Sequence, residues 1–182
     1  AGNIWRGRQG GTMEHTRADH MGMLATVINS LAIQDAFERA DIDARVMTAV
    51  PIEAFAEFYS RNKAVSHLNR GKVTIFGCGM GNPFFSTDTA AVLRGAEIGA
   101  DVVLMAKNID AIYTDDPRKN PDAKKLSEVD YDYILKNHLS AIDTCAASFA
   151  MDNHMKLHIF GLDDSENIYR VIMGEKIGTI VD

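Results

Sequence analysis

At 182 residues the chain is long enough for one domain with a sizeable hydrophobic core. Lys and Arg number 19 against 25 Asp and Glu, and the net charge of −6 argues against a general nucleic-acid binder, which must neutralise phosphates. No apolar run reaches the roughly 18 residues of a membrane span, so we expect neither nucleic acid nor a membrane as partner. The two cysteines, Cys78 and Cys145, form no CxxC pattern and favour a reducing, cytoplasmic location.

The N-terminal part of the chain predicts a loop followed by a helix. Residues 1–17 are rich in Gly and Arg with little periodicity, so we expect a loop there. A helical pattern begins near Ala18, which places Asp19 at the N-terminus of that helix. Apolar residues then recur at three- and four-residue spacing and predict one buried stripe: Leu24, Val27, Ile28 and Leu31.

The rest of the chain alternates strand and helix patterns. Strands are predicted at 44–50, 72–76, 101–106 and 156–160, with a final extended segment at 177–181. Helices are predicted at 53–69, 89–99, 127–136, 140–153 and 166–173, with a long polar loop at 107–125. Because the strands are apolar throughout and are separated by helices, we expect a parallel sheet covered on both faces, in one α/β domain spanning residues 1–182.

A glycine-rich stretch, residues 77–88, joins the strand at 72–76 to the helix that follows. Its glycines let the backbone approach a ligand closely, and the open N–H groups at the helix start favour an anion. Ser86 and Thr87 add hydroxyl donors, and Asp88 can cap the helix. The stretch therefore predicts a phosphate site; the alternative is a tight turn whose glycines serve packing only.

Ligands of open parallel sheets bind beyond the carboxyl ends of the strands, and three loops qualify here. These loops carry phosphate donors, carboxylates and one aromatic residue: Arg6, Arg8, Asp19, Thr87, Asp88, Asp110, Tyr113 and Asp116. That mixture suits a nucleotide bound with a metal ion. Gly71 and Lys72 lack the earlier glycine of a P-loop. His154 and His158 have the spacing of helical metal ligands, but His158 falls in a predicted strand, which favours a structural or exposed role.

Four segments carry a family resemblance and occur in the family's order: 19–26, 79–88, 109–117 and 171–179. They resemble the signatures of the bacterial uridylate kinases, a family of the amino-acid kinase superfamily, and they span nearly the whole chain. The resemblance implies a three-layer α/β/α sandwich with a mostly parallel central sheet. It also implies ATP-dependent phosphorylation of UMP to UDP with Mg²⁺, in a homohexamer that UTP inhibits and that GTP activates in many bacteria.

The resemblance assigns roles to individual residues. Asp19 matches the carboxylate that accepts hydrogen bonds from the UMP ribose hydroxyls. The stretch that wraps UMP corresponds to Met80, Gly81, Asn82, Pro83, Phe84, Phe85, Ser86 and Thr87. Phe84 and Phe85 either shape the uracil pocket or pack in the core. The ATP side corresponds to Gly2, Arg6, Lys107, Asn108, Tyr113 and Asp116, with Lys107 or Asn108 next to the adenine.

Asp143 and Arg6 match catalytic positions near the phosphates, and no residue is assigned to the metal ion. Asp143 taken alone would be interpreted as a helix cap or a surface residue. Three positions depart from the family: Ala1 and Ala111 stand where glycine is usual, and Met80 stands where threonine is commoner. The family's Lys-x-Ser-Gly loop, with its main catalytic lysine, has no counterpart in these 182 residues. We therefore expect a truncated or proteolysed enzyme that binds UMP weakly and turns over slowly or not at all.

Two alternatives remain open. The first is another enzyme of the superfamily that phosphorylates a carboxylate or a carbamate; Arg6, Asp19 and the segment 82–85 favour a nucleotide acceptor over it. The second is a non-catalytic module of the same fold that binds a nucleotide or an oxyanion. The nucleotide loops argue against this second alternative, while the absent lysine keeps it open.

Overall fold

The computed structural model describes residue 5 and residues 11–182. Gly2 and Arg6, predicted ligand positions, therefore lie outside the described residues, as do Ala1 and Arg8. The chain divides into two compact units, Ala1–Thr87 and Asp88–Asp182, and each is described by itself. Within the described part of the chain, no helix combines the length and apolar character needed to cross a membrane.

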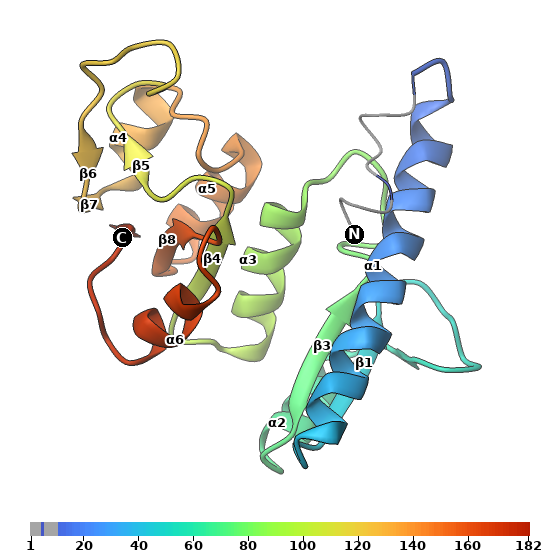
Figure 1. Ribbon diagram of the computed structural model, residues 1–182. Coiled ribbons are helices and arrows are strands. Elements are labelled where there is room, and N and C mark those ends of the chain that lie inside the picture. The colour runs from blue at the N-terminus through green and yellow to red at the C-terminus, as the bar shows by residue number, and fades with distance from the viewer. Residues whose placement is uncertain (1–4, 6–10) are drawn as a thin grey trace. The chain divides into compact units, whose positions relative to one another are not determined.

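The first unit is a parallel sheet with helices. Its elements are α1 (His15–Arg39), β1 (Ala44–Thr48), β2 (Glu57–Phe58), α2 (Arg61–Leu68) and β3 (Val73–Gly77). The strands pair in the order β2-β1-β3, and both pairings are parallel. Helix α1 packs against β1 and β3, as Figure 1 shows. The predicted strands at 44–50 and 72–76 are confirmed as β1 and β3, which pair with each other over all five residues of each strand.

Helix α1 begins one turn earlier than the sequence predicted. The carboxylate of Glu14 caps it by accepting hydrogen bonds from the backbone N–H groups of Thr16 and Arg17, both at 2.9 Å. The expectation of a loop through residue 17 is thus wrong at its end, and Asp19 lies in the second turn instead of at the N-terminus. The first turn carries no apolar periodicity, so the pattern could not reveal it.

The buried face of α1 consists mainly of small residues: Ala18, Ala25, Val27 and Ser30. The predicted stripe is correct for Val27 but wrong for Leu24 and Ile28, which are each 56% exposed. Small side chains let the helix lie close to the sheet, since a Cβ added at Gly77 in β3 would stand 3.2 Å from Ser30 Oγ. The large apolar residues of α1 are left on its outer side.

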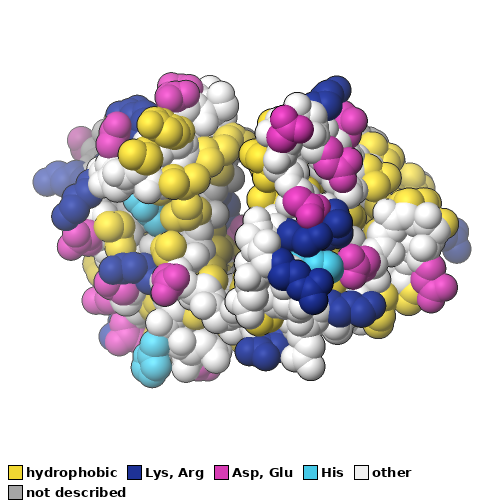
Figure 2. All heavy atoms as spheres, turned by 90° about the horizontal axis from the view of Figure 1, so that it is seen from below, with side chains coloured by type: hydrophobic (Ala, Val, Ile, Leu, Met, Phe, Trp, Pro, Cys, Tyr) yellow, Lys and Arg dark blue, Asp and Glu magenta, His cyan; other side chains and the backbone are white. Residues whose placement is uncertain are grey.

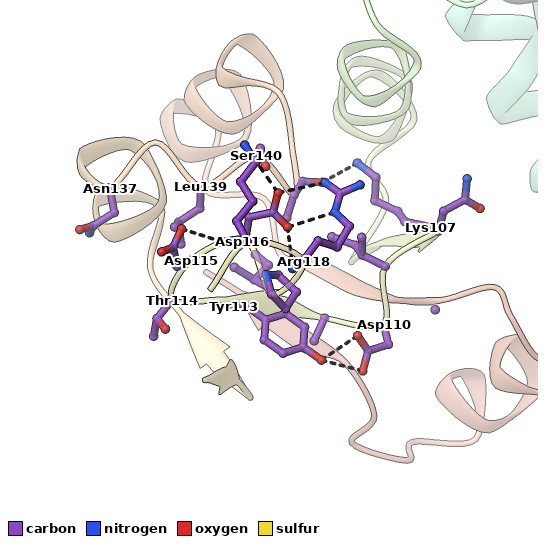
Figure 3. A pocket seen from close by; sticks show the side chains of 18 of the residues that line it. Lys107, Asp110, Tyr113, Thr114, Asp115, Asp116, Arg118, Asn137, Leu139 and Ser140 are labelled. Carbon is purple, nitrogen blue, oxygen red and sulfur yellow. Dashed lines mark hydrogen bonds and ion pairs between the residues drawn. The ribbon is translucent and has the colours of Figure 1, made fainter. Parts of the chain in front are cut away.

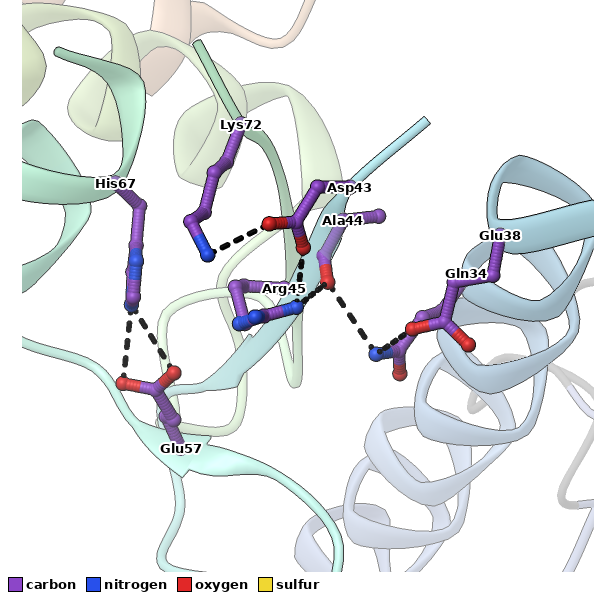
Figure 4. Close-up of polar contacts among 8 residues, drawn as sticks. All are labelled: Gln34, Glu38, Asp43, Ala44, Arg45, Glu57, His67 and Lys72. Carbon is purple, nitrogen blue, oxygen red and sulfur yellow. Dashed lines mark hydrogen bonds and ion pairs between the residues drawn. The ribbon is translucent and has the colours of Figure 1, made fainter. Parts of the chain in front are cut away.

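The helix predicted at 53–69 is shorter in the structure. It begins at Arg61, after the hydroxyl of Ser60 caps the helix by accepting the N–H of Lys63 at 3.4 Å. The preceding Glu57 belongs to β2, and its carboxylate lies 3.0 Å from His67 Nε2 of α2, as Figure 4 shows. Glu57 and Phe58 pair with β1 as a short strand, so they do not join the helix that their composition favours.

The second unit combines a mixed sheet, a short hairpin and helices. Its elements are α3 (Thr87–Ile98, whose first residue closes the first unit), β4 (Val103–Lys107), β5 (Ile112–Tyr113), β6 (Lys125–Leu126), β7 (Glu128–Val129), α4 (Tyr131–Lys136), α5 (Thr144–Asp152), β8 (Leu157–Gly161), α6 (Glu166–Ile172) and β9 (Thr179–Val181). The sheet order is β4-β8-β9-β7, with β8 and β9 antiparallel and the other pairs parallel. Val92 of α3, Ile134 of α4, Ala147 of α5 and Ile159 of β8 pack into one core.

Two predictions for this unit need correction. The stretch 107–125, expected to be a loop, contains β5, which pairs with β6 in an antiparallel hairpin. The helix expected from residue 127 begins only at Tyr131, because Glu128 pairs with Ile180 of β9 and Asp130 then caps α4. The predominantly parallel sheets with packed helices confirm the predicted α/β class.

Candidate functional site

The glycine loop, defined here as residues 77–87, is shaped by contacts within the first unit. Gly81 has φ +80°, and a Cβ added there would lie 2.9 Å from the carbonyl oxygen of Ala49. Its N–H donates to the carbonyl of Cys78 at 2.9 Å, which closes a tight turn. Glycine at position 81 is therefore explained by close packing of the backbone against β1, as the packing alternative had it.

Several amides of the glycine loop donate to protein groups within the described part of the chain. The N–H of Cys78 donates to Thr26 Oγ1 at 2.8 Å, that of Gly81 to Cys78, and that of Phe84 to Asp19 Oδ2 at 2.8 Å. A phosphate that bound to these amides would have to displace their present acceptors. The sequence could not show this, because Thr26 and Asp19 lie more than fifty residues from their partners.

Side chains at the tip of the glycine loop face outward. Asn82 and Thr87 are exposed, and the side chains of Phe84 and Phe85 are 71% and 50% exposed. Core packing therefore explains neither phenylalanine. Met80, which stands where threonine is commoner in the family, is half-buried and packs partly against the protein. The tip thus offers both polar and aromatic groups to a ligand.

A cavity of about 910 Å³ in the second unit brings together four predicted positions: Lys107, Asn108, Tyr113 and Asp116. We call it the polar pocket; it is lined by residues 107–119, 137–141 and 161–163 (Figure 3). Its volume is within the range of small-molecule sites. The segments 137–141 and 161–163 were missed by sequence reasoning, although 161–163 directly follows β8, where the strand-end rule applies.

Ion pairs hold the charged side chains of the polar pocket. Lys107 Nζ donates to Asp88 Oδ2 and, at 2.6 Å, to the carbonyl of Ala141. Asp88 thus lies in the first turn of α3 as the ion-pair partner of Lys107. Arg118 donates to both oxygens of Asp116, at 3.0 and 3.2 Å, and these hydrogen bonds hold the pKa of Asp116 below its usual value.

Asp110 and Tyr113 form a second polar group at the rim of the polar pocket (Figure 3). The Tyr113 hydroxyl donates to Asp110 at 3.0 Å, and Lys125 Nζ donates to the same carboxylate at 3.0 Å. Burial raises the pKa of Asp110, but the hydrogen bonds from Lys125 and Tyr113 outweigh it, so that this pKa is lowered overall. The hydrogen bond to Asp110 raises the pKa of Tyr113.

The lining of the polar pocket does not favour an anion by itself. Its charged side chains are three cations, Lys107, Arg118 and Lys119, and four carboxylates, Asp110, Asp115, Asp116 and Asp163. A ligand with several phosphates would be repelled by the carboxylates unless a cation came with it. The pocket therefore suits a polyphosphate that carries its own divalent ion. Ala111, which stands where glycine is usual in the family, is fully buried beneath the pocket.

Asp143 lies at the start of α5 as its N-cap. Its carboxylate accepts the N–H of Ala146 at 3.0 Å and the hydroxyl of Thr89 in α3 at 3.3 Å. The interpretation as a helix cap is confirmed. Among the described residues, no three or more His, Cys, Asp or Glu side chains gather as a metal site, and His158 Nε2 lies 2.6 Å from the carbonyl of Ile177.

The motif near the C-terminus supports the hairpin beside the polar pocket. The hydroxyl of Thr179, fully buried, accepts the N–H of Ile112 at 2.8 Å and donates to the carbonyl of Leu126 at 2.5 Å. Gly178 has φ +81°, and an added Cβ would overlap the carbonyl oxygen of Ile159. This segment, singled out by resemblance, fixes the hairpin that carries Tyr113.

Comparison with known proteins identifies the family to which this chain belongs. The sequence pattern of the Amino acid kinase family matches residues 5–161, so the chain belongs to that family. It is similar along its entire length to the UMP kinase of Bacillus anthracis, with 35% identity, a TM-score of 0.94 and 76% of that chain covered. The UMP kinase of Ureaplasma parvum gives 33% identity and a TM-score of 0.93, with 100% of this chain and 78% of that chain covered.

A third solved structure is similar to this chain in fold. The uridylate kinase of Archaeoglobus fulgidus shares 24% identity with a TM-score of 0.73, over 97% of this chain and 78% of that chain. The family resemblance predicted from the four segments is thereby confirmed.

Proposed function

We propose that the chain transfers the γ-phosphoryl group of ATP to UMP, giving UDP, a step of pyrimidine nucleotide synthesis. The observation that carries this proposal is the cavity of about 910 Å³ that is lined by all four described ATP positions: Lys107, Asn108, Tyr113 and Asp116. The similarity to two UMP kinases at 35% and 33% identity supports UMP as the acceptor. The proposed acceptor residues lie in the first unit and the described donor residues lie in the second, so the reaction needs both, and we treat residues 1–182 as one functional domain.

The acceptor site is proposed to consist of Asp19 and the glycine loop. Asp19 is held 2.8 Å from the N–H of Phe84, which places a carboxylate next to the exposed tip of the loop. Its remaining oxygen is suited to ribose hydroxyls, because an ionised carboxylate only accepts hydrogen bonds. The residues proposed to surround UMP are Met80, Gly81, Asn82, Pro83, Phe84, Phe85, Ser86 and Thr87.

The donor site is proposed to be the polar pocket. Lys107 Nζ is already engaged by Asp88 and by the carbonyl of Ala141, whereas Asn108 is exposed. We therefore assign the polar contact with adenine to Asn108, and the ATP side further to Tyr113 and Asp116. Gly2 and Arg6, which lie outside the described residues, stay predictions for the phosphates.

Phosphoryl transfer asks for in-line positioning and for neutralisation of charge, since the UMP phosphate is itself the nucleophile. The proposed roles of Asp143 and Arg6 lie here, near the transferring group. Mg²⁺ usually binds with several waters, one or two carboxylates and the substrate phosphates, so Asp143 and the carboxylates of the polar pocket fit it without a dedicated cluster. When bound, the ion would neutralise charge on the transferring oxygens.

Calorimetry and an assay for ADP release test the proposed function together. We expect UMP to bind weakly but saturably to the 182-residue chain, and any ADP to be released from ATP slowly and only when UMP is present. Glutamate derivatives, carbamate and CMP serve as competitors for the acceptor site. Binding and turnover of a carboxylate or carbamate acceptor without binding of UMP would establish the first alternative. UMP and ATP binding with no transfer in any N-terminally extended form would establish the non-catalytic alternative.

A homohexamer is the proposed assembly. Exposed apolar residues lie three and four positions apart on one side of α1: Met21, Leu24 and Ile28, which are 37%, 56% and 56% exposed. Such a stripe is typical of a helix that packs against another copy. Sedimentation analysis of the purified chain checks this, and a monomer at all concentrations would contradict it.

Regulation by GTP and UTP and a cytoplasmic location complete the proposal. Arg45 and Lys72 both form ion pairs with Asp43, and Figure 2 shows Lys and Arg side chains clustered beside a His. Such a group offers donors to an anionic effector. The free thiols of Cys78 and Cys145 suit a reducing compartment.

A further inference from the structure

His15, the first residue of α1, lies against the glycine loop. The centroid of its ring is 4.4 Å from that of Phe84, with an angle of 38° between the two planes. Its Nε2 atom is 3.1 Å from Asp19 Oδ2, one helical turn further along α1. One side chain therefore contacts both the loop and the carboxylate proposed to receive the ribose.

Phe84 needs such support because its backbone is unfavourable. Its φ is +70°, in the left-handed region that a bulky residue adopts only when its surroundings hold it there. The ring is 71% exposed, so burial in a core does not supply the support. The contacts that do are the hydrogen bond from its N–H to Asp19 Oδ2 at 2.8 Å and the ring of His15.

The same contacts fix the carboxylate of Asp19. Oδ2 is shared between His15 Nε2 and the N–H of Phe84, which sets the rotation of the group. Oδ1 has no partner within the described part of the chain, and the side chain is 22% exposed. The geometry leaves one oxygen of a fixed carboxylate directed to a ligand hydroxyl.

We infer that His15 is a positioning residue for the acceptor nucleotide. It acts through Asp19 and Phe84, which it holds in the arrangement that binds the ribose and the base, and it touches no substrate itself. The nature of the ligand rests on the proposed function, whereas the link between His15 and the loop rests on the structure alone.

Substitutions of His15 separate its two contacts. His15→Ala removes both, His15→Gln keeps a donor for Asp19 without the ring, and His15→Phe keeps the ring without the donor. We expect His15→Ala to weaken UMP binding about three- to tenfold with ATP binding unchanged, as one exposed ion pair and one aromatic contact suggest. The other two variants should each recover part of the loss.

Hydrogen exchange of the peptide that contains residues 80–88 gives a second readout, which needs no ligand. We expect the Phe84 amide to exchange faster in His15→Ala, since it loses a neighbour that keeps its acceptor in place. His20→Ala is the matched control, an exposed histidine on the same helix that touches neither group. His15 is itself 56% exposed, so no variant should prevent folding.

The outcomes distinguish this inference from the proposed function. Equal UMP affinity and equal exchange in His15→Ala and His20→Ala would overturn the positioning role. Equal losses of UMP and ATP affinity would also overturn it, because they would indicate a general effect on folding. Faster exchange of Phe84 in a chain that binds no UMP would leave the link intact while the proposed function fails.

Discussion

The glycine loop and the polar pocket hold their shapes by different means. The loop is fixed by its backbone: the amides of Cys78, Gly81 and Phe84 donate to protein groups, and these residues have φ between +65° and +80°. The pocket is held by charged side chains at its rim, whose ion pairs are partly exposed. A backbone frame keeps its shape when a ligand arrives, whereas ion pairs can exchange partners with one.

That difference matches the chemistry proposed for each region. A monophosphate acceptor has to be oriented for in-line attack, which a fixed loop achieves. A polyphosphate with its metal ion has to be admitted among carboxylates, which exchangeable ion pairs allow. The comparison predicts that backbone substitutions damage the loop and that the pocket tolerates the loss of single ion pairs.

The largest effect should come from Gly178, the residue whose backbone supports the pocket. Gly178→Ala adds a Cβ that overlaps the carbonyl oxygen of Ile159 at φ +81°, so we expect a loss of about 3–5 kcal/mol in the free energy of unfolding. Urea denaturation measures it. Gly174→Ala is the control, with φ +92° and no atom within 4 Å of the added Cβ, and should cost about 1 kcal/mol. Equal losses in both would show that the overlap is relieved by a small shift.

The next effect concerns the glycine loop itself. In Gly81→Ala the new Cβ lies 2.9 Å from the Ala49 carbonyl oxygen at φ +80°, and we expect a loss of about 2–3 kcal/mol in stability. UMP affinity should fall with it, while ATP affinity is retained under conditions where the variant is folded. Gly71→Ala, at φ +74° with open space around the Cβ, serves as the control. Unchanged UMP binding in Gly81→Ala would remove the loop from the acceptor site.

A smaller and more selective effect is expected at Asp19. Asp19→Asn keeps the size of the side chain but removes its charge, so UMP binding should weaken by about 1–3 kcal/mol, as for a hydrogen bond to a charged acceptor. Calorimetry with UMP and with ATP measures the two affinities separately. Asp35→Asn, an exposed ion-pair residue on the same helix, should change neither. Equal losses for both nucleotides would contradict the assignment of Asp19.

The smallest effect is expected in the ion pairs of the pocket. Lys125→Ala removes a donor from Asp110, so the lowered pKa of Asp110 should rise. Because that pKa is depressed in the folded state, its contribution to stability is present above about pH 4 and is lost as pH falls through the lowered pKa. We expect less than about 1 kcal/mol at pH 7, measured by denaturation at pH 7 and pH 3. A larger loss at pH 3 than at pH 7 would contradict this sign.

The elements that the sequence predicted best are the strands. The runs at 72–76 and 156–160 lie within a residue or two of β3 and β8, because short runs rich in β-branched and aromatic residues favour strands. Helical periodicity was less informative: it marks the apolar side of α1 but not what covers it, so Leu24 and Ile28 were misplaced. The start of α1 was missed because Glu14 caps it through side-chain geometry that composition does not reveal.

Residues of the candidate site could be predicted where one segment of the sequence contains them. They could not be predicted where segments far apart in the chain meet. Asn108, Tyr113 and Asp116 belong to one stretch and were found together in the pocket. The contact of Lys107 with Ala141, and that of Asp19 with Phe84, join residues far apart in the chain. Such contacts depend on the packing of whole elements, so the amides already used within the loop could not be foreseen.

A crystal structure of the chain with bound UMP is the decisive test of the proposed acceptor site. We expect the monophosphate within hydrogen-bonding distance of donors between residues 82 and 87, and a ribose hydroxyl on Asp19 Oδ1. UMP bound instead in the polar pocket, or at neither place, would contradict it.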